Sequence, residues 1–238
     1  FTYGSLKFGA KHIQSFTKQE VQQNGVFKSD LNQMETSVFS EWNHSKDKFS
    51  CSLGLKANRV HFSNISINKS YYNFLPKAML GYRLNENSFI RYDVEMSQTN
   101  PTLVELTDTE IRLDPYLAER GNLLLKPYSN LNNNLFYEHK KGLFTFNANL
   151  RHHYKHNPIM ESVKEQGNIF LIIPENMKSW NKYNAEMNLK VGMIKNILQF
   201  SLTGGYNHFN SQGNNYSHEY SNFYYSANVL AMYKKWMF

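Results

Sequence analysis

Apolar and polar residues alternate in ten segments of this sequence. In the segment 89–96 one side is apolar and the other is charged: Ile90, Tyr92, Val94 and Met96 against Arg91, Asp93 and Glu95. A period of two is that of a β-strand. Such a strand either packs its apolar side into a soluble core or exposes it to lipid around a wet lumen. The other segments and their connections must distinguish these two cases.

The alternating segments are long and cover most of the chain. They run over 5–16, 31–42, 48–62, 74–84, 89–96, 127–138, 143–154, 183–191, 198–206 and 223–233. Most contain about 10 to 14 residues, whereas strands of soluble proteins typically contain about 5 or 6. A strand that crosses a membrane needs about 9 to 11 residues. The lengths therefore favour membrane strands.

The connections between these segments alternate strictly between long and short. The long ones are 17–30, 63–73, 97–126, 157–179 and 207–218, and the short ones are 43–47, 85–87, 139–142 and 193–196. Outer-membrane barrels have short periplasmic turns at one end and long extracellular loops at the other. The sequence thus predicts an all-β, antiparallel up-and-down transmembrane barrel. The turn 85–87 is expected on the periplasmic side, and the connection 97–126 is expected outside.

The composition agrees with strands that cross a membrane. Aromatic residues make up 15% of the chain, with 16 Tyr and 17 Phe, and they favour strands. No apolar run reaches the roughly 18 residues of a transmembrane helix, so a spanning structure must be a closed barrel. A mean hydropathy of -0.59 does not exclude one, because only alternate residues face lipid. The aromatic residues expected at the membrane interfaces are Tyr71, Tyr72, Tyr82, Tyr137, Tyr154, Trp180, Tyr206 and Trp236.

Charge and termini limit the range of partners. The net charge is +7, but the Lys and Arg residues are scattered rather than gathered in one patch, so we expect no nucleic-acid partner. The single Cys51 cannot form an internal disulfide. The sequence opens inside an alternating segment without an initiator Met, so we expect a piece of a longer polypeptide whose unpaired edge strands could also drive self-association.

The stretch 74–138 carries the motifs of a known family. A Leu-Pro pair, Leu75 and Pro76, opens a strand that contains Leu80 and ends near Tyr82. The next strand carries Arg91 and Tyr92 and leads to a loop that contains Pro101 and Leu106. This loop ends in the sequence GNLLLKPY at 121–128. Leu123 and Tyr128 stand where the family has Pro and Glu, and Phe238 gives the aromatic end typical of the last strand. On these residues the chain resembles the barrel region of TonB-dependent outer-membrane receptors, of the outer membrane protein β-barrel family.

This resemblance implies a function for a parent protein. The family's barrel has 22 strands and is plugged by an N-terminal domain, so residues 1–238 would be one partial barrel domain of about ten strands without plug or TonB-interacting segment. The parent would lie in the outer membrane of a Gram-negative bacterium and import a scarce nutrient with energy from the inner membrane. Its partners would be outer-membrane lipid, the TonB system through the missing parts, and an unknown nutrient.

The sequence offers no catalytic, cofactor or metal residues that we can assign, and the substrate-binding residues are unknown. His152 and His153 must point to opposite faces of a strand, and His156 could join either only through a bend. Acidic residues of the connection 97–126 lack the spacing of a calcium loop: Asp108, Glu110, Asp114 and Glu119. Inward-facing charges are expected to pair with one another in the lumen or to contact a plug: Arg91, Asp93, Glu95, Arg151, Glu186 and Lys190.

Two alternatives from other classes remain open at this point. One is a soluble or surface-attached β-sheet binding module that buries its apolar face by sheet packing or oligomerisation. The other is a self-contained ten-strand outer-membrane enzyme that uses acidic and His residues near the rim. Its candidates would be Asp108, Asp114, His156 and His208, but no known catalytic motif connects them. We therefore expect a protein that is not an enzyme.

Overall fold

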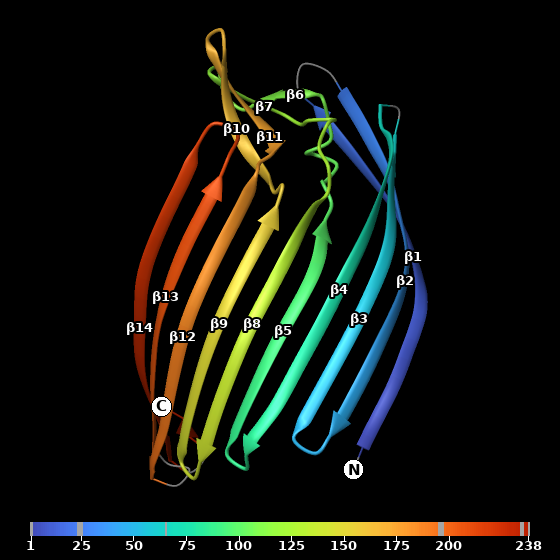
Figure 1. Cartoon of the computed structure of the whole chain (residues 1–238). Coiled ribbons are helices and arrows are strands. Elements are labelled where there is room, and N and C mark those ends of the chain that lie inside the picture. The colour runs from blue at the N-terminus through green and yellow to red at the C-terminus, as the bar shows by residue number, and fades with distance from the viewer. Residues whose placement is uncertain (1, 23–25, 65, 195–197, 234–235, 238) are drawn as a thin grey trace.

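One curved antiparallel sheet forms most of the molecule (Figure 1). The computed structural model describes residues 1–238 except 1, 23–25, 65, 195–197, 234–235 and 238. The sheet order is β1-β2-β3-β4-β5-β8-β9-β12-β13-β14-β15. The strands are β1 Thr2–Gln22, β2 Val26–Lys46, β3 Phe49–Ser63, β4 Asn68–Asn85, β5 Ser88–Thr99, β8 Tyr128–Lys141, β9 Phe144–His156, β12 Ser179–Ile194, β13 Leu198–Gln212, β14 Ser217–Tyr233 and β15 Trp236–Met237. Within the described residues, β1 and β15 end the strand order, so this sheet is open.

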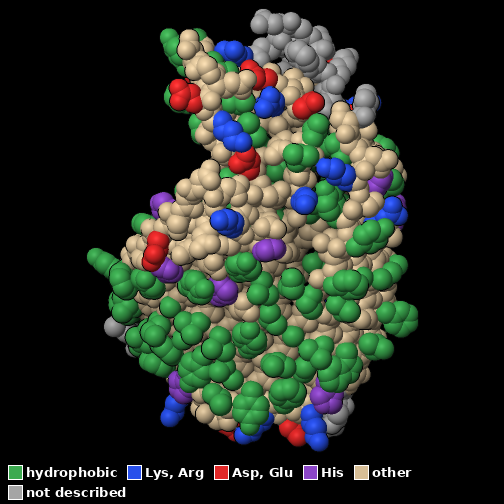
Figure 2. Space-filling view, turned by 45° about the horizontal axis from the view of Figure 1, so that its top comes forward, with side chains coloured by type: hydrophobic (Ala, Val, Ile, Leu, Met, Phe, Trp, Pro, Cys, Tyr) green, Lys and Arg blue, Asp and Glu red, His purple; other side chains and the backbone are tan. Residues whose placement is uncertain are grey.

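All ten long strands predicted from the alternation are present in the described part of the chain. Their outer face is apolar and bare: Phe8, Phe223 and Tyr225 are 81%, 83% and 88% exposed. Figure 2 shows a broad hydrophobic band across the sheet, with charged side chains beyond it at both ends. A soluble protein rarely exposes so large a continuous apolar surface. The described residues contain no helix that is long and apolar enough to cross a membrane.

Short turns join the strands at one end of the sheet, which we call the turn end. The residues between β2 and β3 are Asp47 and Lys48, and those between β8 and β9 are Gly142 and Leu143. Asp47 and Gly142 have φ of 51° and 58°, the left-handed backbone that tight hairpins require. Tight turns are thus confirmed where 43–47, 85–87 and 139–142 were predicted, but they are shorter, because 43–46, 85 and 139–141 belong to strands. Of the predicted turn 193–196, residues 193–194 belong to β12 and 195–196 lie outside the described residues.

At the opposite end, the loop end, three of the five predicted long connections are wrong in extent. Most of 17–30, 63–73 and 207–218 is strand, and β1 and β2 stay paired as far as Gln22 and Val26. The physical reason is that the strands continue past the apolar band, where both faces meet water and alternation is no longer needed. Cross-strand pairing still satisfies the backbone there, and it brings Lys18 opposite Asp30 and Glu20 opposite Lys28.

The two remaining long connections, 100–127 and 157–178, fold together into a second sheet above the loop end (Figure 1). Its strands are β6 Glu110–Arg112, β7 Leu117–Arg120, β10 Ile159–Gln166 and β11 Ile169–Asn176, in the order β10-β11-β7-β6. β11 pairs with β7 in parallel, and this pairing links the two connections. We call both connections together the cap.

The main buried core lies between the cap and the large sheet. The sheet contributes Leu31, Val60 and Phe62, the β3–β4 connection contributes Ile67, and the cap contributes Leu103, Leu106 and Leu125. Tyr71 packs against this core, with its ring 6.0 Å from that of Phe62. Tyr71 was expected in an interfacial belt, but it has the inward parity of β4 and so lies under the cap. Its neighbour Tyr72 points outward and is exposed, as predicted.

Candidate functional site

The candidate site is the concave inner wall of the large sheet beneath the cap. Its side chains are those opposite the apolar band, and every long strand from β2 to β14 contributes polar or charged ones, for example Glu41, Lys56, Lys77, Arg151 and Tyr224. A few apolar side chains, such as Phe39 and Leu75, lie among them. A polar interior facing an apolar exterior is the arrangement of a membrane barrel with a wet lumen. The wall therefore offers hydrogen bonds and charges to whatever enters the lumen.

Several inner-wall charges pair with one another, as the sequence predicted. Arg91 Nε lies 2.9 Å from Asp93 Oδ2, and Arg151 Nη2 lies 3.8 Å from Glu186 Oε1. Glu95 and Lys190 belong to none of the ion pairs found in the described residues. Half-exposed pairs of this kind contribute about 0 to 1 kcal/mol each, so their main effect is to neutralise the wall.

Two glycines let side chains cross a strand to reach a carboxylate. Gly54 lies in register between Glu41 and Lys77, and a Cβ there would meet Lys77 Cε at 2.5 Å. Lys77 crosses this gap and pairs with Glu41. In the same way, Gly205 lies between Glu186 and Tyr224, and the Tyr224 hydroxyl crosses it to donate to Glu186 Oε2 at 2.7 Å. The glycines on β3 and β13 thus leave the space through which Lys77 and Tyr224 reach their carboxylate partners.

Replacing Gly205 by Ala is expected to lower the stability of the barrel by about 1 to 3 kcal/mol, because the added Cβ would meet the Tyr224 ring at 2.4 Å and displace its hydroxyl from Glu186 and Asn184. The measurement is urea unfolding of the protein in lipid vesicles. Gly204→Ala is the matched control, since an added Cβ there meets nothing within 4 Å. Equal midpoints for the two variants would contradict the crossing role of Tyr224.

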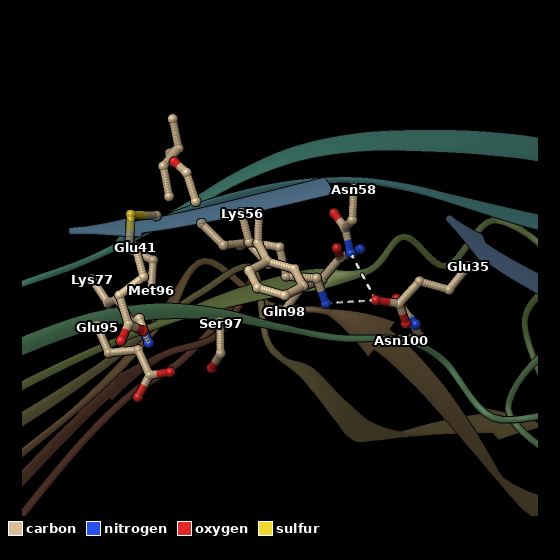
Figure 3. A pocket seen from close by; sticks show the side chains of 14 residues that line it. Glu35, Glu41, Lys56, Asn58, Lys77, Glu95, Met96, Ser97, Gln98 and Asn100 are labelled. Atoms are coloured by element: carbon tan, nitrogen blue, oxygen red, sulfur yellow. Dashed lines mark hydrogen bonds and ion pairs between the residues drawn. The ribbon is translucent and has the colours of Figure 1, made fainter. Parts of the chain in front are cut away.

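One hollow in the described part of the inner wall, the β2–β5 hollow, has a volume of about 430 Å³. Figure 3 shows Glu35 and Asn58 at one end and Glu41, Lys77 and Glu95 at the other, with Gln98 and Lys56 between. Lys56 Nζ lies 2.7 Å from Glu35 Oε1, and Asn58 Nδ2 donates to the same oxygen at 3.4 Å. Each end of the hollow thus holds one ion pair.

The second hollow, the β8–β14 hollow, is larger and basic, with a volume of about 760 Å³. Three cationic side chains line it together with a row of amides: Arg91, Arg151, Lys182, Asn134, Asn149, Asn184 and Asn207. Asn184 Nδ2 donates to Asn207 Oδ1 at 3.0 Å and to the Tyr224 hydroxyl at 3.2 Å. These two bonds connect Asn184 and Asn207 with Tyr224 across β12, β13 and β14.

The histidines singled out in the sequence do not come together. His152 stacks on the outward-facing Tyr183 with ring centroids 4.4 Å apart, whereas His153 lies on the inner face, 5.2 Å from the Trp180 ring. Their opposite orientation was predicted and is confirmed. His156 bonds to Tyr154 and Asn157. Over the described ranges, no group of three or more His, Cys, Asp or Glu residues could hold a metal ion.

Two of the acidic residues singled out in the connection 97–126 make local contacts within the cap. Asp114 Oδ1 accepts from the backbone N–H of Tyr116 at 2.7 Å, and Glu110 lies 3.8 Å from Arg112. His208, the remaining candidate for an enzyme, bonds to Ser221 at 2.9 Å on the outer face. In the described structure none of these contacts joins a candidate acid to a candidate histidine.

The GNLLLKPY motif attaches the cap to its surroundings. A Cβ at Gly121 would lie 2.2 Å from the carbonyl oxygen of Thr107, so only glycine fits this close backbone approach. Asn122 Nδ2 donates to Pro174 O at 3.1 Å, which ties the two cap connections together. Leu125 is buried in the core, and its carbonyl accepts from the Tyr71 hydroxyl at 3.4 Å. The motif thus fixes the cap both to itself and to the sheet.

Comparisons with known proteins agree with this geometry. The outer membrane protein beta-barrel family matches residues 5–237. No curated protein sequence matches the chain. The siderophore receptor PirA from Pseudomonas aeruginosa is 12% identical with a TM-score of 0.61, over 98% of this chain and 52% of that one. A mutant ferric enterobactin receptor from the same organism is 14% identical with a TM-score of 0.67, over 97% and 43%. The copper transporter OprC is 9% identical with a TM-score of 0.60, over 98% and 47%.

The fold and the two faces of the sheet define a wall segment of an outer-membrane β-barrel. The chain belongs to the outer membrane protein beta-barrel family, and its place is the outer membrane of a Gram-negative bacterium. It spans about half the length of the solved structures that it matches. At such low identity these structures show the common fold, and their names describe receptors and transporters for iron, siderophores and copper.

Proposed function

We propose that this chain is part of the barrel of a TonB-dependent receptor that imports a nutrient across the outer membrane. The observation that carries the proposal is one continuous wall, apolar outside and polar inside, with a folded cap over one end. The family match and the likeness to siderophore receptors support it. Such a wall surrounds a wet passage, and its hollows offer places for a solute to bind.

The proposal includes the orientation of the chain in the membrane and the closure of the barrel by other parts of the parent protein. The loop end with its cap faces the outside and the turn end faces the periplasm, as in barrels of this kind. Residues 1–238 form one partial barrel domain, and further strands of the parent pair with the edges at β1 and β15. A plug and the TonB-interacting segment belong to those other parts. Without them, the open edges would favour self-association of the isolated chain.

The decisive experiment is energy-dependent uptake by the parent protein. A strain that lacks its gene is grown in competition with the unmodified strain in media that are each limited in one nutrient, including iron, copper and single glycans. We expect a growth defect in one medium, restored by the gene on a plasmid and reproduced by deleting TonB. A parent protein present in the outer membrane whose loss changes growth in none of these media would contradict the proposal.

A further inference from the structure

We propose that the β2–β5 hollow binds a neutral saccharide unit of the imported nutrient. This inference rests on the proposed import function and adds the chemical class of the ligand. It depends on three properties of the hollow: its charges are compensated, amide groups without partners line it, and it exposes an aromatic ring. The hollow lies directly beneath the cap, because Asn100, one of its lining residues, opens the cap connection 100–127.

Charge compensation argues against a strongly ionic ligand. Four of the five charged side chains of the hollow form two ion pairs, Glu35 with Lys56 and Glu41 with Lys77. Only Glu95 belongs to no ion pair in the described residues. The net formal charge of the lining is thus -1, which suits neither a polyanion nor a metal complex with several negative charges. In the β8–β14 hollow, Arg91 and Arg151 pair with carboxylates that do not line it, and Lys182 belongs to no ion pair among the described residues.

Unpartnered amides call for a ligand that both donates and accepts hydrogen bonds. Asn58 is only 7% exposed, and its Oδ1 has no hydrogen-bond partner among the described residues. Both amide atoms of Gln98 and the Oδ1 of Asn100 are likewise buried without a partner. A buried amide that bonds to nothing is unfavourable, so these groups gain from an occupant that reaches them. Gln98 has the strand parity of Met96, and it borders the hollow beyond Glu95, where the pairing of β5 with β4 has ended.

The exposed ring of Phe39 supplies an apolar surface beside these polar groups. Phe39 lies across Gly9 of the neighbouring strand β1, where an added Cβ would meet the ring at 2.7 Å, so one part of the ring is held in place. The rest is exposed, 43% of the residue, and lines the hollow together with Leu75. A pyranose ring has hydroxyls at its rim and C–H groups on its faces, so it matches amides, a carboxylate and an aromatic ring at once. About 430 Å³ accommodates one or two such units.

The test uses the purified parent receptor in detergent and isothermal titration. The probes are the neutral tetrasaccharides of glucose in α- and β-linkage, of mannose and of N-acetylglucosamine, with tetragalacturonic acid as the anionic counterpart. We expect saturable binding of at least one neutral probe and none of the acid. Gln98→Ala and Phe39→Ala should each weaken that binding about tenfold, the loss of one or two contacts. Gln199→Ala, near the turn end of β13, is the matched control and should change nothing.

Correct folding of each variant is checked by its heat-dependent mobility in gel electrophoresis, and Phe39→Leu replaces Phe39→Ala if the latter does not fold. Failure of all four neutral probes to bind would overturn the inference, as would equal affinity of the wild-type receptor and its Gln98 and Phe39 variants. If the receptor still imports another nutrient in a TonB-dependent way, only the saccharide inference fails. If deleting the gene changed growth in none of the media while saccharide binding was intact, the import function would instead be contradicted.

Discussion

Replacing Phe62 by Ala is expected to release the cap from the inner wall while the large sheet stays folded. Phe62 is 1% exposed and packs with Tyr71 in the core that joins sheet and cap. Loss of a buried Phe side chain costs about 3 to 5 kcal/mol, and here that cost falls on the contact between the two sheets. The bonds from Lys69 Nζ to Leu123 O and from the Tyr71 hydroxyl to Leu125 O, at 3.1 and 3.4 Å, are too few to hold the cap alone.

The measurement for Phe62→Ala is limited trypsin digestion of the receptor in the membrane. Cleavage after Arg112, Arg120 or Lys126 in the cap should become at least tenfold faster, while the sheet remains protected. Phe170→Ala is the matched control, since Phe170 belongs to the cap but is 51% exposed. The rate at which trypsin cleaves the cap of this variant should stay close to that of the wild type. Equal rates for both variants would show that the cap is held by something other than this core.

The strands could be predicted because the signal for them is local. Successive residues of a membrane strand point to opposite faces, so the polarity of each residue indicates whether it faces lipid or the lumen. Leu53 and Ala185 indicate the lipid face, and Lys56 and Glu186 indicate the lumen face. This signal disappears where the strands leave the lipid. Beyond Phe16, three successive pairs of β1 and β2 are polar on both strands, such as Gln19 opposite Ser29, and a polar strand in water has the composition of a loop.

The cap could not be predicted, because its core joins residues that are far apart in the sequence. Leu103, Leu106 and Leu125 carry no period of their own, and the strands β7 and β11 find each other across two separate connections. One signal was available. Val60 and Phe62 have the inward parity of Lys56 and Asn58, so apolar residues at the loop end of a polar face indicated that something covers them.

The candidate site was only partly visible in the sequence. The inward charges were recognised, and their pairing was expected for Arg91 and Arg151. Asn58, Gln98 and Asn100 were missed, because an Asn or Gln in or beside a barrel strand is ordinary and only the structure shows which amides lack partners. The crossing of Lys77 over Gly54 was also hidden, since it depends on the register of three strands.

Replacing Leu202 by Arg is expected to impair insertion and to lower the stability of the inserted barrel by about 2 to 4 kcal/mol, the cost of a charged side chain on the lipid face near the middle of a membrane. Leu202 lies in the apolar band on β13 and is 43% exposed. The adjacent Ser201 points into the lumen between Lys190 and Asn228 on the flanking strands. In Ser201→Arg the same guanidinium group lies in the wet lumen, so the stability of the barrel should change by no more than about 1 kcal/mol.

The pair of variants tests the assignment of the two faces, on which the import function and the site depend. Both receptors are expressed in the parent organism, and their amounts in the outer membrane and their urea unfolding in lipid vesicles are compared. Residues 201 and 202 are adjacent on one strand and lie at almost the same depth in the membrane. Both variants add the same charged side chain there, so the comparison reports which face of the strand meets lipid. A larger loss for Ser201→Arg than for Leu202→Arg would place lipid on the polar face and remove the wet lumen, and with it both hollows as binding sites.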